Sequence, residues 1–471
     1  MRKPIAILLA LVVCLGLTAC AGPASSSAPE AGTASGAASQ SEPQESSVSE
    51  PDSSDGEGVE LPAFQATATI QEAVLYDQDG VKITATELSY GSDAAELGLI
   101  LENNSDRNLT FISNSLGYSC NSVNGYMIAD GYLNCEVAPG KKANESISLS
   151  YGQLMLYGIF EIADLEVGFD ISDDEYNHIY TGPLALTTSA TDGYDYDALS
   201  FSRTMADKTL QQALGFSVPC FVQEPLWEQD GLSVVSGGWL TTREGETALL
   251  LEVKNNSDQS VAVTAGNICL NGLGVYGYDW SYDTINPGKT GIIDANLSEL
   301  LDKNAWGLYG LEEIGSFSMT LNFKDDAGME IGTAADVTVQ NPQGAQSFDA
   351  QGQEVYSADG VRIVFKDLLE DASEYSDDLY AWMLVENDTP GEITVQVATD
   401  TLSLNGYMMD CLSSPVTVKS GASGVLKLQL WGSDLEENAI GSASEVSELE
   451  VDLELWQDGQ MLGETTVQIQ P

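Results

Sequence analysis

A three-fold internal repeat constrains this chain more than any other feature of its sequence. The first recurring element is an Asp-Gly pair between two short runs in which apolar and polar residues alternate. It occurs at Asp79-Gly80, Asp230-Gly231 and Asp359-Gly360. Asp-Gly suits a type I′ turn, where both central residues have positive φ, and alternation is the pattern of a half-buried strand. Each copy is therefore predicted to open with a β-hairpin.

Three further anchors follow in the same order in every copy. They are a polar turn at 103–106, 255–258 and 387–389, an Asn-Gly pair at 124–125, 271–272 and 405–406, and then Gly140, Gly288 and Gly421. We interpret the asparagines as turn residues, because Asn tolerates left-handed backbone and closes local turns with its side chain. Ordered anchors in three copies indicate one module that is repeated three times.

Each copy also offers one short helix. A residue suited to the N-cap is followed three residues later by Gln or Glu, as in a capping box. These pairs are Ser150 with Gln153, Asn296 with Glu299, and Ser433 with Glu436. Many short strands separated by turns are typical of a two-sheet sandwich. We therefore predict an all-β fold of three tandem β-sandwich modules, each with one short helix.

The predicted modules span residues 61–189, 219–340 and 353–471. Residues 190–218 connect the first two and contain a helix-compatible run from Thr204 to Leu214. Residues 341–352 form a shorter linker with Gln, Gly and Pro. Because the two connections differ in length, we expect strung modules and not a regular solenoid.

The N-terminus has the layout of an export signal. Arg2 and Lys3 precede an apolar run from Ile5 to Leu17, which is too short to cross a bilayer. Small residues then lead to Cys20, so residues 1–19 are predicted to be a cleaved signal peptide. Residues 20–60 are rich in Ala, Ser, Pro and Glu and hold no Lys or Arg, which predicts a disordered tether.

Leu17-Thr18-Ala19-Cys20 resembles the lipobox of bacterial lipoproteins. This resemblance implies that Cys20 becomes a lipidated N-terminus, with acyl chains such as palmitate, and that the modules face the extracytoplasmic side of the cell membrane. An ordinary cleaved signal with a chance Cys is the alternative. The order of turns in the three copies resembles immunoglobulin-like domains of bacterial extracytoplasmic lipoproteins, many of unknown function, and implies no catalytic residue.

The charge balance excludes nucleic acid as a partner. The chain has 17 basic and 72 acidic residues, and loss of Arg2 and Lys3 changes its formal charge from −55 to −57. Such a field repels phosphate backbones. It suits a solvated surface, a cationic partner or Ca²⁺. Neither acidic cluster has an EF-hand pattern, and a solvated loop is the alternative to a Ca²⁺ site. The two clusters are Asp192, Asp195 and Asp197, and then Asp367, Glu370, Asp371, Glu374, Asp377 and Asp378.

The inventory for catalysis or metal binding is thin, and we predict that the protein is not an enzyme. His178 is the only histidine and is interpreted as a surface loop residue, so the usual zinc sites are not available. No phosphate loop, dinucleotide fingerprint or nucleophile elbow occurs. Cys120 and Cys135 could close a disulfide in the first copy, and buried thiols are the alternative. No cofactor is predicted.

One aromatic stretch in the second copy is a candidate ligand face. If it is extended, Tyr276, Tyr278, Trp280 and Tyr282 share one side of a strand. Exposed rings beside carboxylates could bind a sugar or a peptide, whereas inward rings would belong to the core. The leading function is a membrane-anchored surface lipoprotein that binds or scaffolds at the bacterial cell envelope. The alternatives are capture of an envelope polysaccharide, peptide or surface protein, and a cell-envelope hydrolase.

Overall fold

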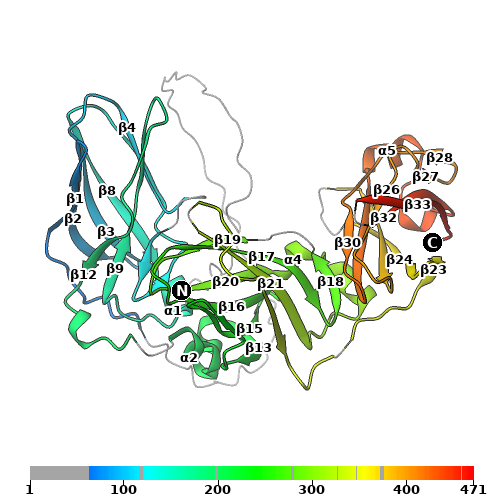
Figure 1. The fold of residues 1–471 in the computed structure, drawn as a ribbon, viewed down its shortest axis with the longest axis horizontal. Helices are drawn as coiled ribbons and strands as arrows, with labels where there is room; N and C mark the ends of the chain where they lie inside the picture. Colours follow the sequence, from blue (N-terminus) through cyan, green and yellow to red (C-terminus); the bar gives the residue numbers. More distant parts are fainter. Residues whose placement is uncertain are drawn as a thin grey trace, which may run out of the picture.

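The computed structural model describes residues 63–471 except 116–119, 197–199, 277–280, 326, 346, 372–375 and 458. It is an all-β protein of three sandwich modules that lie in a row, the first drawn in blue and cyan, the second in green, and the third in yellow to red (Figure 1). In the described part of the chain, no helix has the length and apolar character needed to span a membrane.

The described residues of module 1 form twelve strands and one α-helix. They are Ala73–Gln78 (β1), Val81–Tyr90 (β2), Ala94–Asn103 (β3), Leu109–Ser113 (β4), Ser122–Val123 (β5), Tyr126–Met127 (β6), Leu133–Val137 (β7), Lys141–Ser150 (β8), Tyr151–Leu156 (α1), Asp164–Val167 (β9), Asp170–Asp173 (β10), His178–Tyr180 (β11) and Leu184–Thr187 (β12). The segment that connects it to module 2 holds Thr191–Gly193 (η1), Ser200–Ala206 (α2) and Lys208–Leu214 (α3).

Module 2 begins at Phe216, inside the predicted connecting segment, because its first strand pairs with β15. Its elements are Phe216–Val222 (β13), Trp227–Gln229 (β14), Leu232–Thr242 (β15), Thr247–Asn255 (β16), Val261–Leu270 (β17), Leu273–Tyr276 (β18), Ser281–Ile285 (β19), Thr290–Asn296 (β20), Leu297–Leu300 (α4), Lys303–Tyr309 (η2), Ser316–Lys324 (β21) and Ala335–Gln340 (β22).

Module 3 repeats this order at the C-terminal end. Its elements are Gln353–Ala358 (β23), Val361–Glu370 (β24), Leu379–Asn387 (β25), Ile393–Val397 (β26), Ser403–Leu404 (β27), Tyr407–Met408 (β28), Cys411–Ser413 (β29), Val416–Val418 (β30), Ala422–Leu430 (β31), Gly432–Glu437 (α5), Ala443–Glu445 (η3), Leu449–Gln457 (β32) and Gln460–Ile469 (β33).

The six predicted turns all occur. The Asp-Gly pairs join β1 to β2, β14 to β15 and β23 to β24, and the Asn-Gly pairs join β5 to β6, β17 to β18 and β27 to β28. Both residues of every pair have positive φ, from 49° to 54° at Asp or Asn and from 78° to 87° at Gly. This is the backbone that a type I′ turn requires, so the hairpin prediction is confirmed.

A buried asparagine pins the two sheets of each module together. Asn103, Asn255 and Asn387 are all 0% exposed. Asn255 Nδ2 donates to the carbonyl oxygens of Gln259 (2.9 Å) and Ile285 (2.8 Å), and its Oδ1 accepts from Ser257 N (2.9 Å). Asn103 and Asn387 make the same bonds at equivalent positions. The interpretation of these residues as turn asparagines was therefore incomplete, because each also bridges distant strands.

The helices depart from prediction at two places. The run 204–214 is two helices, because Asp207 ends α2 and caps α3 by accepting from Thr209 N (2.8 Å) and Leu210 N (3.2 Å). In module 3, the helix starts at Gly432 with Trp431 as N-cap, and no side chain of its own caps it. Asp378 Oδ1 instead accepts from Gly432 N (2.7 Å). The capping box at Ser433 was therefore wrong, whereas Ser150 caps α1 as expected.

The modules are joined more closely than the sequence indicated, because strands pair across both joints. At joint 1, β6 of module 1 pairs in parallel with β20 of module 2, so one nine-stranded sheet crosses both modules. At joint 2, β18 of module 2 pairs in parallel with β31 of module 3 inside a ten-stranded sheet. Each joint thus continues a sheet from one module into the next.

Candidate functional site

Polar and apolar contacts join the modules at both joints, and joint 1 centres on a buried carboxylate. Glu252 on β16 is 0% exposed. It accepts hydrogen bonds from Tyr126 Oη of module 1 (2.8 Å), Ser202 Oγ of α2 (2.8 Å) and Ser236 Oγ of module 2 (2.7 Å). Burial and the Glu252 charge raise the pKa of Tyr126. Because a buried charge is costly unless it is hydrogen-bonded, this contact locks three segments together.

Apolar packing surrounds that polar lock. Leu240, Leu250 and Ile292, on the outer face of the first sheet of module 2, belong to the same core cluster as module 1. At joint 2, Val364, Trp382 and Leu384 of module 3 belong to the cluster of module 2. Tyr309, 0% exposed, donates from Oη to Met383 O across this joint (3.1 Å). Both joints therefore bury apolar surface as a single domain does.

Module 1 differs, because the matching face of its first sheet is less apolar. The strand register places Thr84 where module 3 has Val364, whereas Ile100 stands where module 3 has Leu384 and keeps the apolar character. Asn144 stands where module 2 has Ile292. Terminal units of repeat proteins carry polar outer faces, since no neighbour covers them. Module 1 has this property of an end unit.

The linker 341–352 is part of joint 2 and not a free connection. Asp349 N donates to Tyr309 O (2.8 Å), and Lys366 Nζ donates to Asp349 O (3.0 Å). A Cβ added at Gly315 would lie 1.7 Å from Ala345 O, so only glycine allows the linker to approach this closely. Burial lowers the pKa of Lys366, which this segment covers.

A hollow on module 3 has the size of a small-ligand site. Its volume is about 400 Å³, and its lining is Glu392, Thr394, Gln396, Trp456 and Gly459. Trp456 Nε1 (3.0 Å) and Gln396 Nε2 (2.6 Å) both donate to Glu454 Oε2, which fixes the indole on the sheet surface. The register places Ser172 and Lys324 at the equivalent positions of modules 1 and 2. The ring is therefore specific to module 3.

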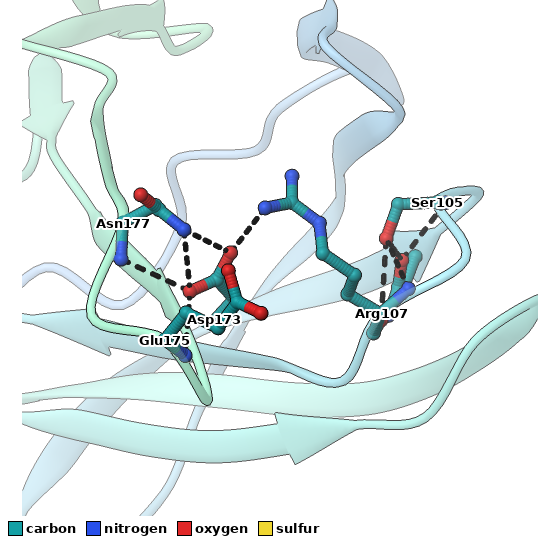
Figure 2. A network of polar contacts seen from close by, with 6 residues as sticks. Ser105, Arg107, Asp173, Glu175 and Asn177 are labelled. Atoms are coloured by element: carbon teal, nitrogen blue, oxygen red, sulfur yellow. Dashed lines mark hydrogen bonds and ion pairs between the residues drawn. The ribbon is translucent and has the colours of Figure 1, made fainter.

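A polar network in module 1 is a structural clamp (Figure 2). Asp173, which is buried, accepts from Asn177 Nδ2 and N, from Glu175 N (2.9 Å), and from Arg107. The hydrogen bonds from Asn177, then that from Glu175 N and the Arg107 charge, hold the pKa of Asp173 below its usual value. Arg107 N in turn donates to Ser105 Oγ (3.3 Å), so the clamp ties the Asn103 turn to β10.

The structure places the predicted aromatic face only in part. Tyr276 ends β18 and Tyr282 lies in β19, and both strands pair antiparallel with β17. Tyr278 and Trp280 lie outside the described residues, as does Cys20, and so the ligand face and the lipidation stay predictions. The Trp456 hollow was missed, because its lining residues come together only through strand pairing. The role of Glu252 was missed for the same reason, because its partner Tyr126 is far away in the sequence.

The other candidate residues that the structure describes have structural roles. His178 lies on strand β11, not in a loop, and its Nδ1 pairs with Asp170 Oδ1 at 2.7 Å. Cys120 and Cys135 are thiols and not a disulfide. Burial, with Glu145 nearby, raises the pKa of Cys135 to about 11. Among the described residues, no group of three or more His, Cys, Asp or Glu side chains is arranged for a metal.

Comparison with known proteins adds little. No family model matches the chain, and no curated protein matches it. A protein of unknown function from Porphyromonas gingivalis W83 is 11% identical over 48% of this chain and 92% of its own, with a TM-score of 0.15. A 1.5-MDa bacterial ice-binding adhesin is 12% identical over 80% and 90%, with a TM-score of 0.14. The BSP domain of a biofilm associated protein is 10% identical over 87% and 67%, with a TM-score of 0.12. Scores this low carry no argument about function.

Proposed function

We propose that this chain is a membrane-anchored surface lipoprotein that displays a stiff row of β-sandwich modules for binding or scaffolding at the bacterial cell envelope. The observation that carries the scaffolding role is the continuation of one sheet through each joint. Interfaces that are small and polar let domains move, whereas these joints bury apolar side chains and hydrogen-bonded polar groups together. A row of this kind holds its far end at a set distance from its anchor.

The polarity of module 1 supports an anchor at the N-terminal end. The outer face of its first sheet carries Thr84 and the exposed Asn144 where the later modules have Val364 and Ile292. The module also follows the predicted tether and the Leu17-Thr18-Ala19-Cys20 motif. A non-enzymatic role fits the few chemically reactive groups described: His178 is exposed and paired with Asp170, and the thiol of Cys135 stays protonated at neutral pH. No nucleic-acid role is proposed, given the net charge of −55.

Metabolic labelling with palmitate tests the anchor. The full chain expressed in a bacterial host should incorporate label and fractionate with membranes. Cys20→Ala should lose both properties, whereas Cys135→Ala, which leaves the motif intact, should keep them. Lipidation at Cys20 would be refuted if Cys20→Ala kept the label. It would also be refuted if the parent chain were cleaved after residue 19 and secreted without label.

Capture of an envelope polysaccharide is a second candidate function, and the Trp456 hollow favours it. Flat indole rings stack on sugar rings, while amide and carboxylate groups such as Gln396 and Glu392 bond hydroxyls. The test is retention of the full chain on purified envelope polysaccharide. Trp456→Ala should abolish retention, and Trp431→Ala, which removes an indole 38% exposed outside the hollow, should not. Equal retention of the two variants contradicts capture at this site.

A further inference from the structure

Module 3 contains a second copy of the segment that builds joint 1, and this copy lies on the surface. The same tetrapeptide, Asn-Gly-Tyr-Met, occurs at 124–127 and at 405–408. In joint 1, Tyr126 and Met127 are only 6% and 8% exposed, and Met127 packs into the core cluster of module 2. Tyr407 and Met408 are 53% and 63% exposed. Two large side chains that are buried at one joint are thus left on the surface at the end of the row.

The two existing joints share one register. The residue after the Asn-Gly turn lies opposite the second residue after the recurring glycine of the next module. Tyr126 therefore pairs with Thr290, which follows Gly288, and Leu273 pairs with Ser423, which follows Gly421. At joint 1 the backbone bond runs from Thr290 N to Gly125 O (2.9 Å).

Among the strands that the structure describes, one of each kind that this register joins lies at the end of its sheet. Strand β28 with Tyr407 ends the order of its sheet, β28-β27-β32-β26-β30. Strand β8 ends the order β1-β2-β3-β8, and its Lys142 is the second residue after Gly140. An open strand edge is a template for pairing with another chain. The pairing that continues the row is Tyr407 opposite Lys142.

The charges at the two ends are complementary. Asp410, Glu445 and Glu448 are exposed beside β28. Lys141 and Lys142 begin β8, in a chain with only 17 basic residues, and both are exposed. Lys142 Nζ also pairs with Glu102 Oε2 of its own module (2.7 Å), so Lys141 is the main charge offered to a partner. The contact surfaces are also less apolar than those of the internal joints, because Asn144 stands where module 2 has Ile292, and Asn438 replaces the buried Tyr157 and Tyr309 of the earlier modules. Such a joint is weaker than the internal ones and is sensitive to salt.

We propose that a second copy of this chain docks head-to-tail, with the β8 edge of one copy against strand β28 of the other. The contact is heterologous, so it extends into a row of chains and does not close as a dimer. This inference rests on the proposed scaffolding role. Palmitate labelling tests lipidation at Cys20, whereas disulfide trapping tests the strand register between two copies. Either proposal can therefore fail while the other holds.

Disulfide trapping of the full chain in membranes tests the register. Two differently tagged copies are coexpressed, one with Tyr407→Cys and the other with Lys142→Cys, and are then oxidised mildly. Paired strands bring Cα atoms within disulfide reach. The matched control replaces Lys142→Cys by Ser146→Cys on the same strand, which shifts the partner by about 13 Å. We expect a mixed-tag dimer for the first pair and none for the control or for two wild-type copies.

A substitution at the contact gives a second readout. With the first cysteine pair in place, Met408→Asp should lower the trapped yield about tenfold, because it puts a charge where a partly buried thioether should lie. Leu412→Asp changes an equally apolar side chain, 55% exposed and outside β28, and should leave the yield unchanged. Equal trapping of the Lys142 and Ser146 pairs, trapping within one chain, or trapping only to a different envelope protein would overturn the proposal.

Discussion

Substitution of Asn255 by alanine should unfold module 2 far more readily than the same change at its neighbour Asn256. Asn255 is 0% exposed and bonds through its side chain to Gln259 O, Ile285 O and Ser257 N. Asn256 is exposed. The pair is a matched control, since residue type, strand end and turn are shared and only burial and bonding differ.

The expected cost follows from the bonds lost. Three hydrogen bonds contribute about 1 kcal/mol each, and the buried carbonyl of Ile285 is left without this donor, so Asn255→Ala should cost about 4 kcal/mol. That is a large part of the roughly 5–15 kcal/mol that stabilises a typical domain. Asn256→Ala should cost less than about 0.5 kcal/mol. Asn255→Asp should be at least as harmful as alanine, because an oxygen replaces the nitrogen that faces two carbonyls.

Hydrogen exchange in a urea series measures this in each module separately. The opening free energy of peptides from β16 and β17 should fall in Asn255→Ala, while peptides from β3 in module 1 should change less. Asn103→Ala and Asn387→Ala should give the mirror result in their own modules. If Asn255→Ala proved as mild as Asn256→Ala, the asparagine would be a turn residue only, and the pin between the sheets would be wrong.

Three further predictions concern the clamp and the joints. The pKa of Asp173 is lower in the folded protein than in the unfolded chain. Its contribution to the stability of module 1 is therefore present above the unfolded pKa of about 3.8 and is lost as pH falls through the folded value. Melting between about pH 5 and about pH 2 should show this loss in the parent and not in Asp173→Asn. Tyr126→Phe removes the one hydroxyl that the described residues of module 1 give to Glu252, and it should cost joint 1 about 1.5–3 kcal/mol. A double-mutant cycle with Ser202→Ala checks this, and additive effects would contradict a shared lock. Gly315→Ala should displace the linker 341–352 and raise the hydrogen exchange of that linker. Gly441→Ala should leave the linker unchanged, because a Cβ added at Gly441 would lie 3.6 Å from its nearest neighbour, Glu445 Oε2.

The local features of the fold could be predicted because their causes are local. Asp-Gly and Asn-Gly specify type I′ turns through the φ values that those residues accept, so six hairpins followed from pairs of adjacent residues. Ser150 caps α1 with its own oxygen on Gln153 N, three residues away. The repeat of these signals was enough to indicate an all-β protein of sandwich modules.

Contacts between distant residues were decided only by the tertiary structure. In the sequence, Asn255 can be recognised only as a turn residue. Its second role depends on the carbonyl of Ile285, which is 30 positions away. Glu252 and Tyr126 are 126 residues apart, and α5 takes its N-terminal partner from Asp378, 54 positions earlier. Trp456 faces Thr394 only because β26 and β32 pair in one register. Unequal linker lengths argued against a regular solenoid but did not reveal the contacts between modules. Strand edges and apolar outer faces join the modules, since an unpaired edge and an uncovered apolar face are both costly in water.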